Sequence, residues 1–316
     1  MLKIKYKKIK LAIQSAKKIL VTAHQKPDGD ALGSIFAITK YLESQGKNYK
    51  IYIEGENNYK NMPFLNFTSV DIKNISNANF DALITLDSGD LARTGLDKAI
   101  TGLKIINIDH HISNNNFGDI NLVNSNASST TEILTKFFQT VNFEIDKDTA
   151  SALLLGILTD TDNFSNKGTS SDAFAISSYL LEKGANIAKF NRNNHKNKKI
   201  DTLKFWGKSF ERIKENKQYN FAHTVIHKNE IKNAEKNGFI EKVEDLVNFF
   251  NNLKNLDFVM VLKEQENSVK ISLRTTKENI NLSYFAIFFN GGGHKKAAGF
   301  TINGCIKKTA YGWKIV

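Results

Sequence analysis

The sequence has few cysteines, few prolines and no long apolar run. Its one cysteine, Cys305, excludes an intramolecular disulfide framework and a cysteine-ligated zinc site, and it fits a reducing compartment. No apolar run reaches the ~20 residues of a membrane-spanning helix. The basic start, residues 1–8, lacks the apolar core and the cleavage site of a signal peptide. These absences predict a cytoplasmic protein that does not associate with membranes.

The positive charge of the chain is concentrated in its C-terminal part. Of 44 Lys and Arg and 32 Asp and Glu residues, 23 and 12 respectively fall in residues 191–316, a net charge of +11 against +1 for residues 1–190. A polyanionic partner such as a nucleic acid would explain this excess. Solvated lysines on helix faces would explain it as well.

The 316 residues are enough for two domains. Short apolar segments alternate with amphipathic ones in the first half, which predicts an α/β fold with a mostly parallel sheet and flanking helices. The predicted strands are residues 19–23, 50–53, 82–86 and 104–108, and the predicted helices are residues 31–45, 133–138, 148–158 and 170–183. Further strands are predicted at residues 219–226, 258–262 and 269–273.

A polar and basic stretch at residues 187–199 is typical of a linker. We therefore expect an N-terminal parallel-sheet domain of residues 1–186, a linker of residues 187–215 and a smaller C-terminal α/β domain of residues 216–316.

Acidic and histidine residues follow four of the predicted elements. They are His24, Asp28 and Asp30 after strand 19–23, Asp87 after strand 82–86, Asp109, His110 and His111 after strand 104–108, and Asp160 after helix 148–158. Ligands of open α/β sheets bind beyond the carboxyl ends of the strands. Any one of these segments could be a surface loop with a helix cap. Four such segments in one chain instead predict that their side chains form a single cluster.

Carboxylates packed this closely repel one another and need cations to stay ionised. Asp and His ligands without thiolate suit octahedral divalent ions, and imidazole favours manganese (Mn²⁺) over Mg²⁺, which stays the alternative. Two ions about 3.5–4 Å apart that share a carboxylate would polarise a phosphoryl oxygen and activate water. The cluster therefore predicts hydrolysis of phosphoesters.

Together with the C-terminal segment Gly-Gly-Gly-His-Lys-Lys-Ala-Ala-Gly of residues 291–299, these motifs resemble the DHH phosphoesterase superfamily and its associated DHHA1 domain over nearly the whole chain. The resemblance implies one ion held by His24, Asp28 and Asp87, and a second held by Asp30, Asp87, His110 and Asp160. It also implies that His111 faces the substrate phosphate as a catalytic residue beside the bridging Asp87, with Asp109 in a supporting role.

The resemblance places substrate binding in the C-terminal domain. It implies that Arg274 and the glycine-rich segment with Gly292, Gly293 and His294 bind the nucleotide phosphate. A guanidinium has a planar fork suited to phosphate, and glycines let backbone amides approach an anion. A tight turn at the glycines and a plain surface charge at Arg274 are the alternatives.

Two other groups of residues allow two interpretations each. Arg93 could reach the metal-bound phosphate, or it could form an ion pair with Asp90 or Asp97. Aromatic residues precede the glycine-rich segment and could stack bases, but their helical spacing favours a place in the core. These residues are Phe285, Phe288 and Phe289.

The chain resembles in build the compact two-domain oligoribonuclease and pAp phosphatase members of the superfamily, rather than its pyrophosphatases or the longer RecJ-like exonucleases. This implies hydrolysis of short oligoribonucleotides (nanoRNA) to mononucleotides, of 3′-phosphoadenosine 5′-phosphate (pAp) to AMP, or of both. The expected partners are short RNA or DNA substrates, and the sequence also allows a homodimer. A phosphodiesterase for linear or cyclic dinucleotides of the pGpG, pApA or c-di-AMP type is the alternative. A less favoured alternative is a nucleotide-binding protein without catalytic activity.

Overall fold

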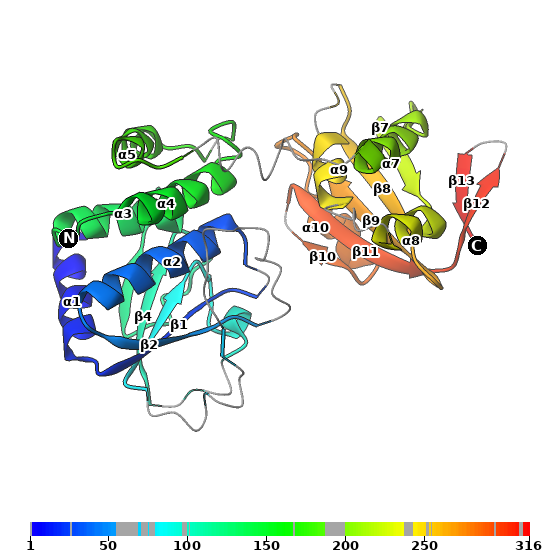
Figure 1. Ribbon diagram of the computed structural model, residues 1–316. Helices are drawn as coiled ribbons and strands as arrows, with labels where there is room; N and C mark the ends of the chain where they lie inside the picture. Colours follow the sequence, from blue (N-terminus) through cyan, green and yellow to red (C-terminus); the bar gives the residue numbers. More distant parts are fainter. Residues whose placement is uncertain are drawn as a thin grey trace. The chain divides into compact units, whose positions relative to one another are not determined.

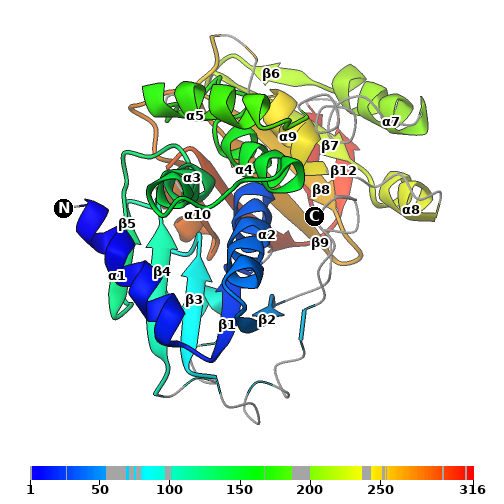
Figure 2. The same ribbon diagram turned by 60° about the vertical axis from the view of Figure 1, so that its left-hand side comes forward.

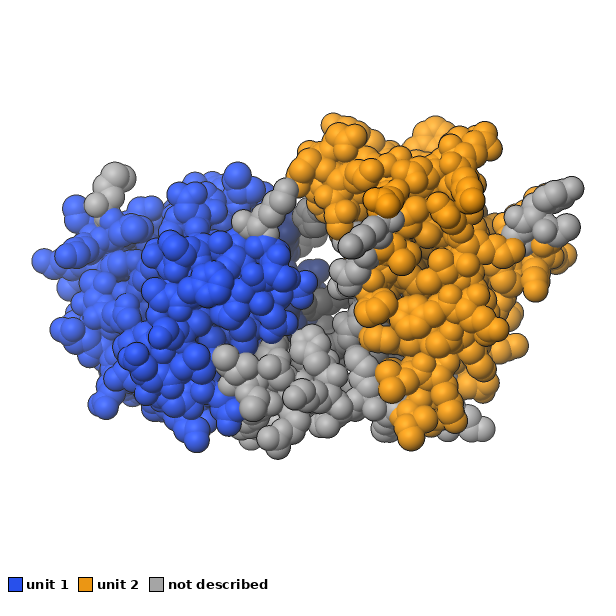
Figure 3. Space-filling view, turned by 90° about the horizontal axis from the view of Figure 1, so that it is seen from above, with its two compact units in different colours: residues 1–196 blue, residues 197–316 orange. Residues whose placement is uncertain are grey.

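The chain folds into two compact units, residues 1–196 (unit 1) and 197–316 (unit 2), which Figure 3 colours blue and orange. The computed structural model describes residues 2–25, 27–54, 69–70, 75, 80–96, 100, 102–166, 168–186, 200–236, 243–250, 253, 255–293, 295–309 and 312–316. Each unit buries hydrophobic side chains of its own.

Unit 1 is built on a parallel sheet of five strands in the order β2-β1-β3-β4-β5 (Figure 2). Its strands are β1 (Lys18–Ala23), β2 (Asn48–Tyr52), β3 (Ala82–Leu86), β4 (Lys104–Asp109) and β5 (Ile120–Val123). Because all strands are parallel, their carboxyl ends share one edge of the sheet. The segments that follow the central strands β1, β3 and β4 therefore lie side by side.

Helices pack on this sheet and on one another and form the main core of unit 1 (Figure 1). Helices α1 (Leu2–Ser15), α2 (Gly29–Ser44) and α3 (Thr130–Thr140) contact the sheet, α4 (Lys147–Asp160) packs on α2 and α3, and α5 (Ser171–Glu182) packs on α3 and α4. The short 3₁₀ helix η3 (Ala92–Thr94) contacts β1. Alternate residues of β1 point to opposite faces of the sheet. Ile19 and Val21 pack in the main core with the helices, whereas Leu20 packs with Leu83 and Leu96 in a second cluster.

The predicted α/β class and the predicted strands and helices of this unit are confirmed, with ends shifted by a few residues. Helix α1 and strand β5 were not predicted. The lysine-rich sequence of α1 hides an amphipathic pattern, since Tyr6, Ile9 and Ile13 are buried at helical spacing against the core. Strand β5 is only four residues long, which leaves little pattern to detect.

Unit 2 is a mixed sheet of six strands in the order β10-β11-β9-β8-β7-β6, in which only the pair β7–β8 is parallel. Its strands are β6 (Lys214–Asn216), β7 (Phe221–Ile226), β8 (Phe258–Glu264), β9 (Ser268–Arg274), β10 (Gly292–Gly293) and β11 (Ala297–Asn303), followed by the hairpin β12 (Ile306–Thr309) and β13 (Gly312–Ile315). Its helices are α7 (Ile200–Glu211), α8 (Lys228–Lys236), α9 (Val243–Phe250) and α10 (Leu282–Phe288).

Two expectations for the second half differ from the structure. Residues 200–215, expected as linker, instead form α7 and most of β6, because Phe205, Trp206 and Phe210 pack against the core of unit 2. The rest of the expected linker, residues 187–199, lies outside the described residues. The core assignment of the three phenylalanines was wrong for Phe288, which is 81% exposed, and for Phe285, which is 47% exposed although its ring contacts Phe300. Phe289 packs on the core as expected.

Helices that could cross a lipid bilayer are absent from the described parts of the chain.

Candidate metal centre

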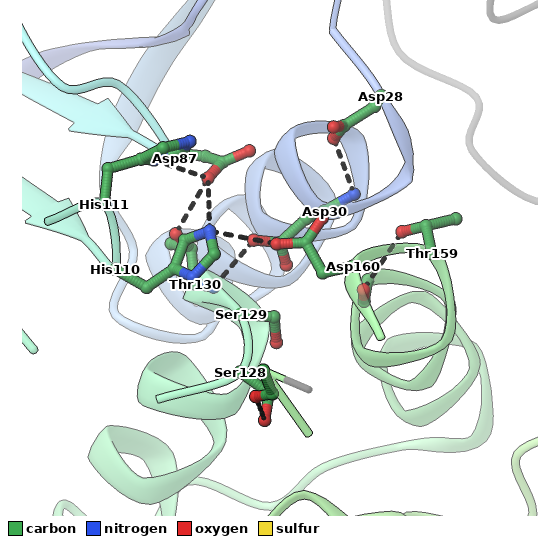
Figure 4. A network of polar contacts seen from close by, with 12 residues as sticks. Asp28, Asp30, Asp87, His110, His111, Ser128, Ser129, Thr130, Thr159 and Asp160 are labelled. Atoms are coloured by element: carbon green, nitrogen blue, oxygen red, sulfur yellow. Dashed lines mark hydrogen bonds and ion pairs between the residues drawn. The ribbon is translucent and has the colours of Figure 1, made fainter. Parts of the chain in front are cut away.

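Acidic and histidine side chains from three strand ends and two helix ends meet at the carboxyl edge of the sheet of unit 1. Figure 4 shows those of Asp28, Asp30, Asp87, His110, His111 and Asp160. They are His24 after β1, Asp28 and Asp30 at the start of α2, Asp87 after β3, His110 and His111 after β4, and Asp160 at the end of α4. All residues that the sequence suggested as metal ligands therefore lie in one place. His24 and Asp160 are 136 positions apart in the sequence, and the fold brings them to the same site.

Asp87 stands between two groups of possible ligands. Its Oδ2 lies 3.5 Å from Nε2 of His24, which is itself 3.9 Å from Oδ1 of Asp28. Its Oδ1 lies 3.5 Å from Nε2 of His110, which is 2.9 Å from Oδ2 of Asp160. The two carboxylate oxygens of Asp87 thus face different histidines, as a carboxylate shared by two cations would.

Local backbone geometry places the carboxylates at the start of α2 and the end of β3. Asp28 is the N-cap of α2, and its Oδ1 accepts hydrogen bonds from the backbone N–H groups of Asp30 and Ala31 at 3.0 and 3.1 Å. Asp87 has a φ of +53°, in the left-handed region that Asp tolerates better than most residues. This turn brings the buried Asp87 carboxylate, only 2% exposed, out of line with β3.

Asp30 is held by the N-terminus of α3. Its Oδ2 accepts a hydrogen bond from the backbone N–H of Thr130 at 2.6 Å, and its Oδ1 accepts from the N–H and the hydroxyl of Thr131 at 2.9 and 2.7 Å. The Thr130 hydroxyl donates to Asp87 Oδ1 at 3.1 Å. The start of α3 therefore binds two carboxylates, in keeping with the partial positive charge of a helix N-terminus.

Hydrogen bonds also orient two of the imidazoles. Nδ1 of His24 donates to the Gln25 carbonyl at 2.7 Å, so that Nε2 faces the carboxylates. His111 Nδ1 lies 2.7 Å from Oδ1 of Asp109, a fully buried carboxylate whose Oδ2 accepts from the Asn114 side chain at 2.6 Å. Asp109 thus supports His111, the role that the resemblance implied for it.

The cluster concentrates negative charge. Complete burial, followed by the charges of Asp87 and Asp160, holds the pKa of Asp30 well above its usual range. Burial by itself lowers the pKa of His110, but its hydrogen bond to Asp160 and the nearby carboxylates raise it to about 10. The carboxylates therefore stabilise a positive charge in the cluster, whether on a protonated histidine or on a cation.

These residues fit divalent cations. Asp28, Asp30, Asp87 and Asp160 supply oxygen donors, and His24 and His110 supply nitrogen donors, all within three groups whose donor atoms lie within 4.8 Å of one another. No thiolate takes part, and the carboxylates accept hydrogen bonds that orient them, as is usual for ligands. Oxygen and imidazole donors suit Mn²⁺ and Mg²⁺ rather than softer metals.

Two hollows flank the cluster. One, of about 290 Å³, is lined by His24, Gln25, Asp28, Asp87, Arg93 and His111. The other, of about 590 Å³, is lined by His110, His111, Asp160 and the segments 125–128 and 168–170. Both interpretations of Arg93 fit this geometry, since its Nε lies 3.4 Å from Asp90 Oδ2 while the residue lines the first hollow. Asp97 lies outside the described residues.

The substrate-binding residues expected from the sequence belong to unit 2. Arg274 ends β9 and is paired in register with Ala297 of β11, while Gly292 and Gly293 form β10. A Cβ at Gly293, whose φ is +135°, would lie 2.5 Å from the Ala297 carbonyl oxygen, whereas no atom of the described residues lies within 4 Å of a Cβ at Gly292. The expected His294 lies outside the described residues.

Sequence reasoning did not assign the residues that hold the ligands. Thr130, Thr131 and Asn114 have no motif of their own, although Thr130 and Thr131 directly follow the N-cap Ser129 of α3. A run of hydroxyl residues at a helix start was the available signal, but it predicts a cap rather than partners 100 residues away.

Comparisons with known proteins identify both domains of the chain. Residues 18–157 match the model of the DHH family, N-terminal domain, and residues 220–310 match that of the DHHA1 domain. The protein MG371 of Mycoplasma genitalium is 28% identical over 292 residues, covering 90% of this chain and 87% of that protein. The bifunctional oligoribonuclease and PAP phosphatase NrnA of Thermus thermophilus is 26% identical over 297 residues, covering 93% of this chain and 86% of that protein.

A solved structure is similar along both units. The crystal structure of an exopolyphosphatase-related protein from Bacteroides fragilis has a TM-score of 0.84 and 27% sequence identity, and the match covers 94% of this chain and 90% of that one. The two family matches occur in the order that the sequence motifs suggested, and together they span both units. The chain therefore belongs to the DHH phosphoesterase family and joins a DHH N-terminal domain to a DHHA1 domain.

Proposed function

We propose that the chain is a Mn²⁺-dependent phosphoesterase that hydrolyses short oligoribonucleotides to mononucleotides and pAp to AMP. The position of Asp87 carries this proposal, because its two oxygens face two separate His and Asp groups at 3.5 Å each. A relative of similar length, covered over 86% of its chain, is named an oligoribonuclease and PAP phosphatase. A cytoplasmic location, where short RNA arises, fits this activity.

In this proposal His24, Asp28 and Asp87 hold one cation, and Asp30, His110 and Asp160 hold the other together with Asp87, whose Oδ1 lies 3.5 Å from Nε2 of His110. The cations would supply Lewis-acid polarisation of the phosphoryl group and a more acidic water. Mg²⁺ is the alternative metal, because the donor set accepts both ions.

His111 is the proposed acid of the reaction. As water attacks phosphorus and the bond to the leaving oxygen breaks, Nε2 of His111 gives that oxygen its proton. Asp109 accepts the hydrogen bond of Nδ1 at 2.7 Å and so turns Nε2 away from itself. Arg93 lines the same hollow and contacts the substrate phosphate there.

Arg274, Gly292, Gly293 and His294 of unit 2 bind the phosphates of the nucleotide. The open space around a Cβ at Gly292 supports this role, since no atom in the described part of unit 2 requires a glycine there. A close approach of a phosphate to the Gly292 backbone would require one. Arg274→Ala is expected to raise KM on a dinucleotide substrate, and an unchanged KM would count against this assignment.

The test is one purified protein assayed against pAp, pGpG, a five-nucleotide RNA and a long single-stranded RNA, with Mn²⁺ and with EDTA. We expect release of phosphate from pAp and of mononucleotides from the short RNA, both abolished by EDTA, and little product from the long RNA. Hydrolysis of pGpG alone would instead assign a dinucleotide phosphodiesterase. Nucleotide binding without any product would assign a binding protein.

Two variants test the metal ligands, and a third is their control. Asp87→Ala and Asp160→Asn are expected to abolish hydrolysis while the circular dichroism spectrum stays native. Asp148→Asn is the matched control, because Asp148 is an exposed carboxylate in the first turn of α4, at the opposite end of that helix from Asp160. Substantial activity of Asp87→Ala in the presence of Mn²⁺ would refute the two-cation site.

A further inference from the structure

Helix α10 of unit 2 leaves large apolar side chains in water. Phe288 is 81% exposed, Tyr284 is 73% exposed and Ile287 is 59% exposed, while the opposite side of the helix buries Leu282 and Ala286. Tyr284 and Phe288 are four residues apart and therefore neighbours on one helix face. Exposed apolar side chains that adjoin one another are a recurrent feature of binding sites.

Neighbouring rings connect Phe288 to the sheet. Phe289 contacts Phe288 with ring centroids 5.1 Å apart and stacks on Phe300 of β11 at 4.5 Å and 12°. Phe285 packs edge-on against Phe300 at 5.8 Å. The helix that carries Tyr284 and Phe288 is thus packed on the sheet through Phe285 and Phe289.

This face adjoins the segment proposed to bind phosphate. The backbone N–H of Gly291 donates to the Ala286 carbonyl at 2.8 Å, so α10 leads directly into β10. The backbone N–H of Leu282 donates to the Lys295 carbonyl at 2.9 Å, which ties the start of α10 to the other side of the glycine-rich segment. Both ends of the helix are therefore attached to that segment within unit 2.

Cationic residues flank α10 along the chain. Lys277 precedes the helix, and Lys295 and Lys296 follow the glycine-rich segment to which its start is tied. Lys277 pairs with Asp257 and Lys296 with Glu278, and α10 itself has no charged side chain. An apolar face flanked by cationic side chains matches single-stranded nucleic acid, whose bases are flat and apolar and whose backbone is anionic. A second copy of this chain would bring the same cations to the contact, which disfavours self-association through this face.

We propose that Tyr284 and Phe288 form a stacking platform for bases of the oligonucleotide, next to the phosphate-binding segment. This inference rests on the proposed function, because it assumes a nucleic-acid substrate. Stacking on aromatic rings tolerates every base and changes affinity by roughly 5- to 150-fold per base. The platform would bind RNA of several nucleotides more tightly than pAp, whose single base offers less to stack.

The test compares two RNAs of five nucleotides, one complete and one with abasic sites at its internal positions. Binding of each end-labelled RNA is measured by equilibrium dialysis with excess EDTA, so that no hydrolysis is needed. We expect the wild-type protein to bind the complete RNA at least 5-fold more tightly than the abasic one. The double variant Tyr284→Ala/Phe288→Ala is expected to lower this preference to less than twofold, and Phe288→Trp is expected to keep it.

Tyr219→Ala is the matched control, because Tyr219 is a 63% exposed ring of unit 2 outside α10, and it should retain the full preference. A preference that survives in the double variant would overturn the platform. So would a wild-type dimer that the double variant converts to monomers in light scattering, since a second copy would then cover this face. Loss of the proposed function would show separately, as a lack of Mn²⁺-dependent product from the complete RNA.

Discussion

Replacing Gly156 by alanine would test the close packing of α4 that surrounds Asp30. A Cβ at this position would lie 2.3 Å from Oγ1 of Thr131 and 2.5 Å from Oδ1 of Asp30. Overpacking of this kind destabilises a protein by about 1–3 kcal/mol, while alanine in place of glycine stabilises a helix by about 0.5–1 kcal/mol. The two effects together leave a net loss of up to about 2.5 kcal/mol in the free energy of unfolding. Because the contacted oxygens of Asp30 and Thr131 are held in buried hydrogen bonds, we expect about 1–2 kcal/mol, or about 2–8 °C in Tm. Mn²⁺ should also bind more weakly, because Asp30 must move.

The assay is thermal unfolding followed by circular dichroism, with EDTA and with Mn²⁺, together with calorimetric titration of Mn²⁺. Gly207→Ala is the matched control, because Gly207 lies within α7 and no atom of the described residues lies within 4 Å of a Cβ at this position. This control should stabilise unit 2 by about 0.5–1 kcal/mol. A Gly156→Ala protein at least as stable as wild type, with unchanged Mn²⁺ affinity, would refute the packing argument.

Two further predictions concern the glycine-rich segment and pH. Gly293→Ala should lower Tm, because its Cβ would lie 2.5 Å from the Ala297 carbonyl oxygen. Gly292→Ala should leave Tm unchanged and raise KM. Equal effects of the two substitutions on Tm would contradict the different packing of the two glycines. Nearby carboxylates raise the pKa of His24 to about 9 and of His110 to about 10, despite the opposing effect of burial. Their protonation stabilises the metal-free protein below pH 6.5, and this stabilisation is lost as pH rises through 9. Since Mn²⁺ must displace these protons, the increase in Tm on adding Mn²⁺ should be larger at pH 8 than at pH 6, and an equal increase would argue against ligation by these histidines.

Much of the site could be predicted from the order of residues along the chain. The strand that ends at Ala23 and the one that ends at Leu86 are short apolar runs, and each is followed at once by His or Asp. Parallel strands bring such ends to one edge, so the clustering of His24 and Asp87 follows from secondary structure alone. The α1 helix escaped prediction because its lysines mask the buried face that includes Ile9.

By itself, the sequence determined the fold class, the ligand types and the edge of the sheet where they gather, because strand periodicity and residue chemistry are local properties. Tertiary structure alone decided that the two oxygens of Asp87 face different histidines and that the start of α3 binds Asp30. It also decided that Phe288 points into water while Phe289 stacks on the sheet. These features depend on distances between atoms far apart in the chain, and such distances are set by packing rather than by any local pattern.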